Sequence, residues 1–261
     1  MPELPDVEMF RNHFDQTSLN EVVAEVDIID DYILKMKKDK FRDIIRGKTF
    51  QASRRHGKYL FIELNEGNLM LHFGMSGNLQ HFQKKGEKPK YSKIIFQFES
   101  GNFLSVISVR KLGKVKIITD IDEYVQNKKL GPDALRIKEE NFLNQMNDKR
   151  SYLKTALMDQ ETICGIGNIY SDEILFQAKV YPKKKINKLS NSDLANLHGH
   201  THNVLEIAVK RLTDNKELPK HFLIPHREKG ERCPQCKGGI QRFEISRSEE
   251  RRVGKECATG C

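Results

Sequence analysis

The sequence predicts an α+β protein of several domains: an N-terminal β-sandwich, a helical domain and a short C-terminal arm. Short β-rich runs separated by turn residues fill much of the region from 20 to 120, which is typical of a sandwich. Apolar residues then recur at three- and four-residue steps between about 139 and 212, as they do in amphipathic helices. Near the end, Cys233-Pro234-Gln235-Cys236 has the spacing of a zinc-ribbon knuckle, in which one turn supplies two thiolates.

The first domain is expected to cover residues 1–130. It begins with a helix from Asp6 to Leu19, because Val7, Phe10 and Phe14 fall at helical steps. We interpret residues 20–120 as strands joined by short turns. Hairpin turns are expected at Asn65–Gly67 and Ser100–Asn102. The clearest strand runs are Phe50–Ser53, Tyr59–Leu64, Leu69–Phe73, Ile94–Phe98 and Phe103–Ile107.

The second domain is expected at 131–215, after the breaker cluster Leu130–Asp133. Three histidines, His198, His200 and His202, recur at every second residue of its last helix. We therefore expect that they do not share one helix face and do not bind a metal. The expected helices are Glu139–Met146, Lys154–Met158, Ile169–Ala178 and Asp193–Leu212, the last with Ser190 or Ser192 as its cap.

The charge balance favours a nucleic-acid partner. Lys and Arg number 45 against 36 Asp and Glu, which gives a net charge of +9. A basic surface can neutralise phosphates and release their counterions, although other classes of basic protein share this excess. No apolar run approaches the ~18–20 residues that span a membrane. The first segment is acidic and rich in proline, unlike a secretory signal, so we expect a cytoplasmic protein without membrane association.

The N-terminal residues offer a nucleophile. Methionine before proline is readily removed, which would leave the secondary amine of Pro2 at the chain start. A free α-amine has a pKa of roughly 7.7–8.0, so about a tenth is neutral at pH 7 and can form a Schiff base. Glu3 could transfer a proton beside that amine. A frayed, inactive terminus is the alternative interpretation.

Two motifs, one at the N-terminus and one in the helical domain, resemble those of a known protein family. The run Met1–Glu8 resembles the start of the formamidopyrimidine-DNA glycosylase and endonuclease VIII family, with Asp6 where that family has Glu. Gly165–Tyr170, continued by Ser171–Phe176, resembles the family's helix-two-turns-helix signature. The resemblance covers residues 2 to about 245. It implies a bifunctional DNA glycosylase and AP lyase that excises oxidised bases from damaged double-stranded DNA through a Schiff base on Pro2.

The resemblance also implies the site residues. Pro2, Glu3 and Lys58 would be catalytic, with Lys58 approaching the DNA backbone at the lesion. Leu112 stands where the family has a phenylalanine wedge, and Tyr91 where it has a histidine. Asn168 would cap the next helix and bind a phosphate. The implied DNA-binding residues are Met75, exposed by a turn between Gly74 and Gly77, with Tyr91, Arg110, Leu112, Lys149, Arg150, Lys154 and Asn168.

The arm, residues 216–261, is expected to be a zinc ribbon that holds one structural zinc ion and is possibly incomplete. Cys233 and Cys236 form the first ligand pair, and Cys257 with Cys261 would be the second. Cys261 lies one residue farther along than the family's spacing places it. The charged run Arg247–Cys257 resembles the translation of a sequencing adapter, so our hypothesis is that residues from about 246 are foreign sequence.

Two other functions remain open from the sequence. A non-catalytic nucleic-acid-binding protein could use the same helical turn and ribbon, and a zinc-ribbon transcription factor would explain the arm alone. For the glycosylase we expect a monomer. About 20 residues, Thr213–Arg232, separate the last helix from Cys233, which is short for a lid over a flipped purine. The sequence therefore predicts that 8-oxoguanine is a poor substrate relative to ring-opened purines, hydantoins or oxidised pyrimidines.

Overall fold

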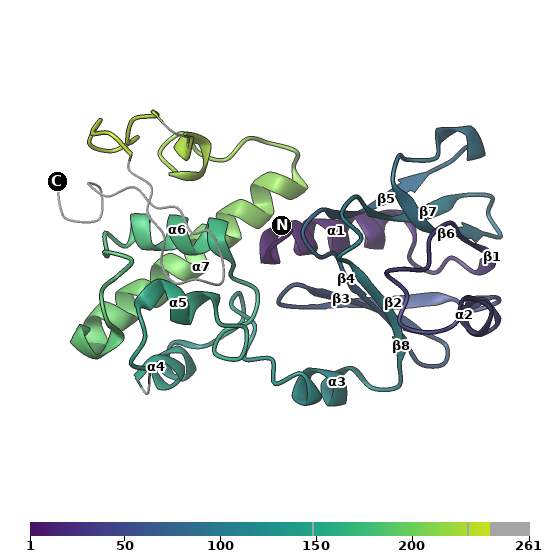
Figure 1. The fold of residues 1–261 in the computed structure, drawn as a ribbon, viewed down its shortest axis with the longest axis horizontal. Coiled ribbons are helices and arrows are strands. Elements are labelled where there is room, and N and C mark those ends of the chain that lie inside the picture. The colour runs from purple at the N-terminus through teal and green to yellow at the C-terminus, as the bar shows by residue number, and fades with distance from the viewer. Residues whose placement is uncertain (148, 229, 241–261) are drawn as a thin grey trace. The chain divides into compact units, whose positions relative to one another are not determined.

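The computed structural model describes residues 1–147, 149–228 and 230–240. The chain divides into two compact units, each with its own core (Figure 1). The sandwich unit contains residues 1–2 and 6–128. The helical unit contains Glu3–Pro5 and the chain from Lys129 onward. The short segment Glu3–Pro5 therefore packs with residues that follow it by more than a hundred positions.

Within the described residues, the strands of the sandwich unit form two antiparallel sheets, as the sequence predicts. The strands pair in register except at irregularities in the β1–β6, β2–β3 and β6–β7 pairs, and His56 pairs with Tyr59 across the tight turn between β2 and β3. One sheet has the order β1 (Val23–Ile28), β6 (Ser92–Phe98), β7 (Phe103–Ser108) and β5 (Gly77–Phe82). The other has the order β2 (Phe50–His56), β3 (Tyr59–Leu64), β4 (Asn68–His72) and β8 (Lys114–Ile118).

One hydrophobic core joins both sheets to two helices. Helix α1 (Leu4–Thr17) buries Phe14 against Phe50 of β2, with ring centroids 5.7 Å apart. Phe50 also packs edge-on against Phe96 of β6 at 5.5 Å. These rings belong to different sheets and a helix, so their burial holds the layers of the unit together.

Two helices lie where the sequence suggested strands or a boundary. Helix α2 (Lys38–Ile45) corrects the interpretation of residues 20–120 as strands throughout. Its buried Phe41 and Ile45 are four residues apart and share one helix face, a pattern too short to stand out beside the strands. Helix α3 (Ile121–Asn127) begins at Asp120, whose side chain accepts a bond from the Glu123 N–H.

The helical unit contains the expected helices. They are α4 (Glu139–Asn147), α5 (Leu153–Met158), α6 (Asn168–Gln177) and α7 (Asn191–Thr213), with 3-10 turns η2 (Ile186–Lys188) and η3 (Ile224–His226), while η1 (Lys85–Glu87) lies in the sandwich unit. Ser190 caps α7 in a capping box with Asp193. Among the described residues, no helix combines the length and the apolar character that crossing a membrane requires.

The histidine prediction was partly wrong. His198 and His202 are four residues apart on α7 and do share a face, with ring centroids 4.6 Å apart. Nε2 of each ring lies 2.9 Å from the carbonyl oxygen of Ile137. Both rings therefore help to join α7 to the segment that precedes α4. No group of three or more metal-binding side chains occurs among the described residues.

Candidate active site and nucleic-acid interface

The turn between β4 and β5 exposes Met75, as predicted. Its side chain is 46% exposed, although the neighbouring Phe73 is buried. Gly74 adopts φ +62°, and a Cβ there would lie 2.5 Å from the Leu112 carbonyl carbon. At Gly77 a Cβ would lie 2.3 Å from the Phe73 carbonyl oxygen. The two glycines thus permit a turn tight enough to present Met75 to solvent.

A second loop, residues 109–113, lies directly beside that turn. The Arg110 N–H donates to Ser76 Oγ at 2.9 Å, and Arg110 Nη1 lies 3.8 Å from Met75 Sδ. Leu112 is 49% exposed. The structure therefore brings Met75, Arg110 and Leu112 together at one exposed edge of the sandwich unit. Such apolar side chains beside a cation could enter between bases, as wedges do in kinked DNA.

Asp30 holds this loop in place. Lys111 Nζ lies 2.7 Å from Asp30 Oδ2, and Lys93 Nζ approaches the same oxygen at 3.3 Å. The hydrogen bond from Lys111, with the Tyr32 backbone N–H and Lys93, lowers the pKa of Asp30 to about 2. Tyr32 itself is 66% exposed. Sequence reasoning missed Asp30, because its contacts with Lys93 and Lys111 join segments that are far apart along the chain.

Lys58 and Tyr91 occupy contrasting positions in the same unit. Lys58 lies in the turn between β2 and β3 and is only 7% exposed. Its charge contributes, after burial and Lys114, to a lowering of the pKa of His72 to about 4. Tyr91 precedes β6 with φ +63° and is 58% exposed. Tyr91 is thus open to a ligand, while Lys58 presents little surface.

Glu3 is bound to the helix-two-turns-helix segment. Its side chain is 1% exposed, and its Oε2 accepts the Gly167 N–H at 2.8 Å and the Tyr170 N–H at 3.2 Å. Oε1 accepts the Ile169 N–H at 2.8 Å. The Leu4 N–H also donates to the Gly165 carbonyl oxygen at 3.0 Å. A carboxylate at these N–H groups is favoured, because the N-terminus of α6 carries partial positive charge.

This arrangement corrects the role predicted for Asn168. Asn168 is the first residue of α6, and the N-cap is Gly167, which has no side chain to cap with. The capping contacts come from Glu3 instead, far away in sequence. Contact of Asn168 with a phosphate stays a prediction.

Lys154, one of the implied DNA-binding residues, lies inside the helical unit. Its side chain is fully buried and forms an ion pair with Asp172, which is fully buried as well. Arg227 Nη2 lies 2.6 Å from the other oxygen of Asp172. The physical reason is that a buried carboxylate needs cations or hydrogen-bond donors close by, and here Lys154 and Arg227 supply both. The burial of Lys154 was not predicted from the sequence, and contact of Lys154 with DNA stays a prediction.

Exposed cations lie elsewhere in the helical unit. Lys149 is partly exposed, 3.6 Å from Asp159, and Arg150 is exposed. A hollow of about 700 Å³ at the end of α7 was missed from the sequence, although its basic residues cluster within about ten positions. The cations Lys210, Arg211, Lys216 and Lys220 line it, together with Asp214 and His221.

The first cysteine pair forms a compact knuckle. The N–H groups of Gln235 and Cys236 point at Cys233 Sγ, each at 3.4 Å, and Lys237 turns the chain with φ +64°. The spacing is that of half of a four-sulfur zinc site, but Cys233 is disulfide-bonded in this structure and so does not present a thiolate. Cys257, Cys261 and the adapter-like run lie outside the described residues. Zinc therefore stays a prediction, and no catalytic step below depends on it.

Comparison with known proteins identifies the family. The family model of the formamidopyrimidine-DNA glycosylase N-terminal domain matches residues 1–115, and that of the formamidopyrimidine-DNA glycosylase H2TH domain matches 130–217. The chain belongs to the formamidopyrimidine-DNA glycosylase family. Formamidopyrimidine-DNA glycosylase of Shouchella clausii is 34% identical over 80% of this chain and 78% of its own length. That of Streptococcus agalactiae is 29% identical over 90% of this chain and 92% of its own length.

Solved structures of formamidopyrimidine-DNA glycosylases share the fold. A complex of the LlFpg protein with a THF-DNA and an inhibitor superposes with a TM-score of 0.89 at 25% identity, covering 98% of this chain and 99% of that chain. MutM in complex with carbocyclic 8-oxo-G containing DNA gives a TM-score of 0.88, also at 25% identity and with the same coverage. The family is thus supported by both sequence and fold over most of the chain.

Proposed function

We propose that this protein is a bifunctional DNA glycosylase and AP lyase. It removes oxidised bases from duplex DNA through a Schiff base on Pro2 and then cleaves the strand by elimination. The observation that carries this proposal is the Pro2-Glu3 start, with Glu3 bound at the N-terminus of α6, in a chain of this family. Relatives named formamidopyrimidine-DNA glycosylase support the glycosylase step.

The proposed reaction begins at the Pro2 amine. Once Met1 is removed, the neutral amine attacks C1′ of the sugar while the base leaves with the electrons of the glycosidic bond. The Glu3 carboxylate takes the proton that the Pro2 nitrogen releases after attack and delivers it to the ring oxygen as the sugar opens, and backbone N–H groups fix where this carboxylate lies. The product is an iminium between Pro2 and C1′.

Strand cleavage follows from that iminium. Its positive charge acidifies the proton on the neighbouring sugar carbon, and loss of this proton expels the 3′ phosphate. Lys58 positions the phosphate and assists proton transfer in this proposal. Hydrolysis of the iminium then returns the Pro2 amine. The residues of the chain supply each group that this chemistry requires.

DNA with a flipped lesion is the proposed partner. The exposed edge with Met75, Arg110 and Leu112 suits the gap that an extruded base leaves. The basic hollow at the end of α7 suits the phosphate backbone. We propose that the protein acts as a monomer in the bacterial cytoplasm.

Because segment 213–232 is short, 8-oxoguanine opposite cytosine should be excised more slowly than ring-opened purines, hydantoins or oxidised pyrimidines. Single-turnover excision rates on matched duplexes test this order.

Borohydride trapping tests whether Pro2 forms a Schiff base with the sugar. Reduction should link the wild-type protein covalently to abasic-site DNA, whereas protein that retains Met1 behind an N-terminal tag should give no linked product. Pro2→Gly should trap less, because it leaves a weaker amine nucleophile. Trapping at full yield by the tagged protein would refute Pro2 as the nucleophile. If no form of the protein traps, the non-catalytic binding function is favoured instead.

A further inference from the structure

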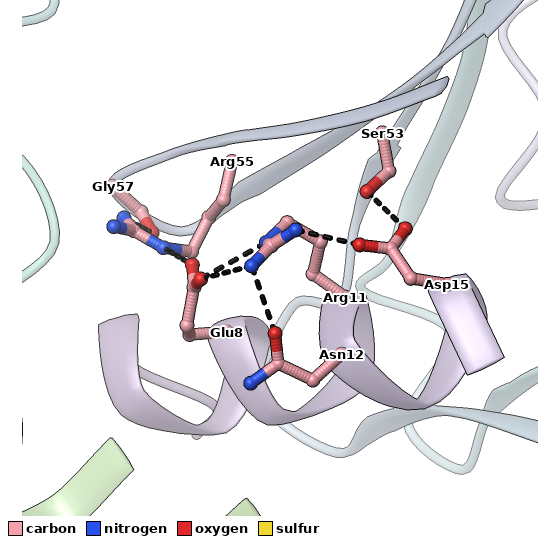
Figure 2. Close-up of polar contacts among 7 residues, drawn as sticks. All are labelled: Glu8, Arg11, Asn12, Asp15, Ser53, Arg55 and Gly57. Carbon is pink, nitrogen blue, oxygen red and sulfur yellow. Dashed lines mark hydrogen bonds and ion pairs between the residues drawn. The ribbon is translucent and has the colours of Figure 1, made fainter. Parts of the chain in front are cut away.

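Arg55 is a fully buried arginine in β2, close to the turn that carries Lys58. Its Nε forms an ion pair with Glu8 Oε2, from helix α1. Its Nη1 donates to the carbonyl oxygen of Gly57 at 3.1 Å (Figure 2). One guanidinium group therefore joins an acidic side chain to the backbone of the turn.

Glu8 is held firmly on its other side. Nε and Nη2 of Arg11 donate to Glu8 Oε1 at 2.9 and 2.7 Å. Nη1 of Arg11 reaches Asp15 Oδ2 at 2.6 Å, and Ser53 Oγ donates to Asp15 Oδ1 at 2.5 Å. Figure 2 shows this row of contacts running from α1 to β2. Both oxygens of Glu8 are thus engaged, so Arg55 is anchored to a side chain that is itself fixed.

The turn that Arg55 contacts has little freedom. His56 pairs with Tyr59, so Gly57 and Lys58 are the central residues of a two-residue hairpin. Gly57 has φ +56°, the sign that a type II′ turn requires at its first central position. The Gly57 carbonyl belongs to the peptide group that contains the Lys58 nitrogen. A bond to that oxygen therefore orients the peptide plane from which the Lys58 side chain departs.

We propose that Arg55, anchored by Glu8, is a positioning residue for Lys58. It holds the Gly57–Lys58 peptide in the one orientation that directs the Lys58 ammonium to its phosphate. Arginine suits this task because its planar group carries several donors in a fixed geometry, whereas lysine has a single ammonium on a flexible stem. The proposal rests on the proposed function, in which Lys58 acts on DNA.

The alternative is that the ion pair between Arg55 and Glu8 only stabilises the fold and does not position Lys58. A stabilising pair would affect activity through the amount of folded protein, whatever residue stands at position 58. A positioning residue would affect the chemical step, and only while Lys58 is present. A double-mutant cycle separates these two cases.

The experiment compares Arg55→Lys, Lys58→Ala and the double variant with the wild-type protein. Arg54→Lys is the matched control, because Arg54 is the neighbouring residue of β2 and forms an exposed ion pair with Asp122 at 2.6 Å. The measurements are single-turnover cleavage of abasic-site duplex, duplex affinity and the thermal unfolding midpoint. Arg55→Lys should slow cleavage about tenfold or more, with duplex affinity within about twofold, as expected when an interaction of the transition state is lost. Arg54→Lys should stay within about twofold in both.

The double-mutant cycle tests whether the effect of Arg55 on cleavage depends on Lys58. In the Lys58→Ala background, Arg55→Lys should cause no further loss. An equal loss in both backgrounds, or wild-type cleavage by Arg55→Lys, would overturn the inference while leaving the proposed function intact. If Arg55→Lys does not fold, Glu8→Gln takes its place in the same cycle with the same criteria. A wild-type protein that fails to cleave or trap abasic DNA would instead overturn the proposed function, and this inference with it.

Discussion

Two regions of the molecule hold their candidate functional residues in opposite ways: the loops at 74–77 and 109–113 in the sandwich unit, and the helix-two-turns-helix region in the helical unit. In the sandwich unit, Met75 and Leu112 are about half exposed, on loops fixed by glycine and by the contact of Lys111 with Asp30. In the helical unit, Glu3 and Lys154 are buried and satisfied by internal partners. The difference teaches that a residue matched to a binding motif can be held ready at a surface, or can first maintain the fold that presents other residues.

Buried carboxylates in α6 extend this contrast. Asp172 pairs with Lys154 and Arg227, and Glu173 accepts the N–H groups of Leu223 and Ile224 at 3.1 and 2.8 Å. Burial raises the pKa of Glu173. These contacts fasten the segment before Cys233 to α6. Asp172 and Glu173 of α6 therefore serve internal connections, whereas exposed cations such as Arg150 lie elsewhere in the helical unit.

The largest effect should come from Lys154→Ala. Removing the lysine leaves the buried Asp172 with Arg227 alone, and loss of one partner of a buried pair costs about 3–5 kcal/mol of unfolding free energy. Lys149→Ala is the control, since its pair with Asp159 is partly exposed and is worth about 0–1 kcal/mol. Urea unfolding measures both. Equal stabilities of the two variants would contradict the contrast between a buried and a partly exposed ion pair.

A smaller loss is expected for Glu3→Ala. The N–H groups of Gly167, Ile169 and Tyr170 would lose a charged acceptor, and hydrogen bonds to charged groups contribute about 1.5–3 kcal/mol. Glu3→Gln should lose less, because the amide oxygen still accepts. Urea unfolding again gives the values, and an unchanged Glu3→Ala variant would show that these contacts do not stabilise the helical unit.

Next in size is Gly74→Ala in the sandwich unit. Its Cβ would meet the Leu112 backbone at 2.5 Å, and such overpacking costs about 1–3 kcal/mol in addition to the strain of a positive φ. Gly101→Ala provides the control, because its φ is +87° and no heavy atom lies within 4 Å of the added Cβ. The difference between the two unfolding free energies isolates the close approach of the loops. Equal losses would mean that Leu112 moves aside freely.

The smallest effect should be the pH dependence of the Asp30 contact. Its pKa is lowered from 3.8 to about 2, so its stabilising contribution is fully present above about pH 4 and is lost as pH falls toward 2. Asp30→Asn should therefore reduce stability at pH 5 and have little effect at pH 2. Acid unfolding curves of the two proteins measure this. If the stabilities of the two proteins differ by the same amount from pH 5 to pH 2, the effect of Asp30 does not come from the ionisation of its carboxyl group.

The local sequence pattern was sufficient to predict most helices and strands and part of the candidate functional site. The periodicity around Phe142 and Leu197 and the β-rich runs around Phe61 and Phe96 predicted most helices and strands, because burial of one face repeats along the chain. The exposure of Met75 was also predictable, since glycines at 74 and 77 impose the turn through their own conformations. Family membership followed from motifs that the sequence displays directly.

Only the tertiary structure decided which partners the polar residues have. Glu3 caps a helix 164 positions away, a role the sequence assigned to Asn168, and Lys154 is neutralised by Asp172 rather than left open to solvent. Arg55 and Asp30 gain their roles in the same way, from Glu8 and Lys111. The physical reason is that local periodicity encodes which face is buried, whereas a charge is satisfied by whichever distant group the fold brings within hydrogen-bonding distance.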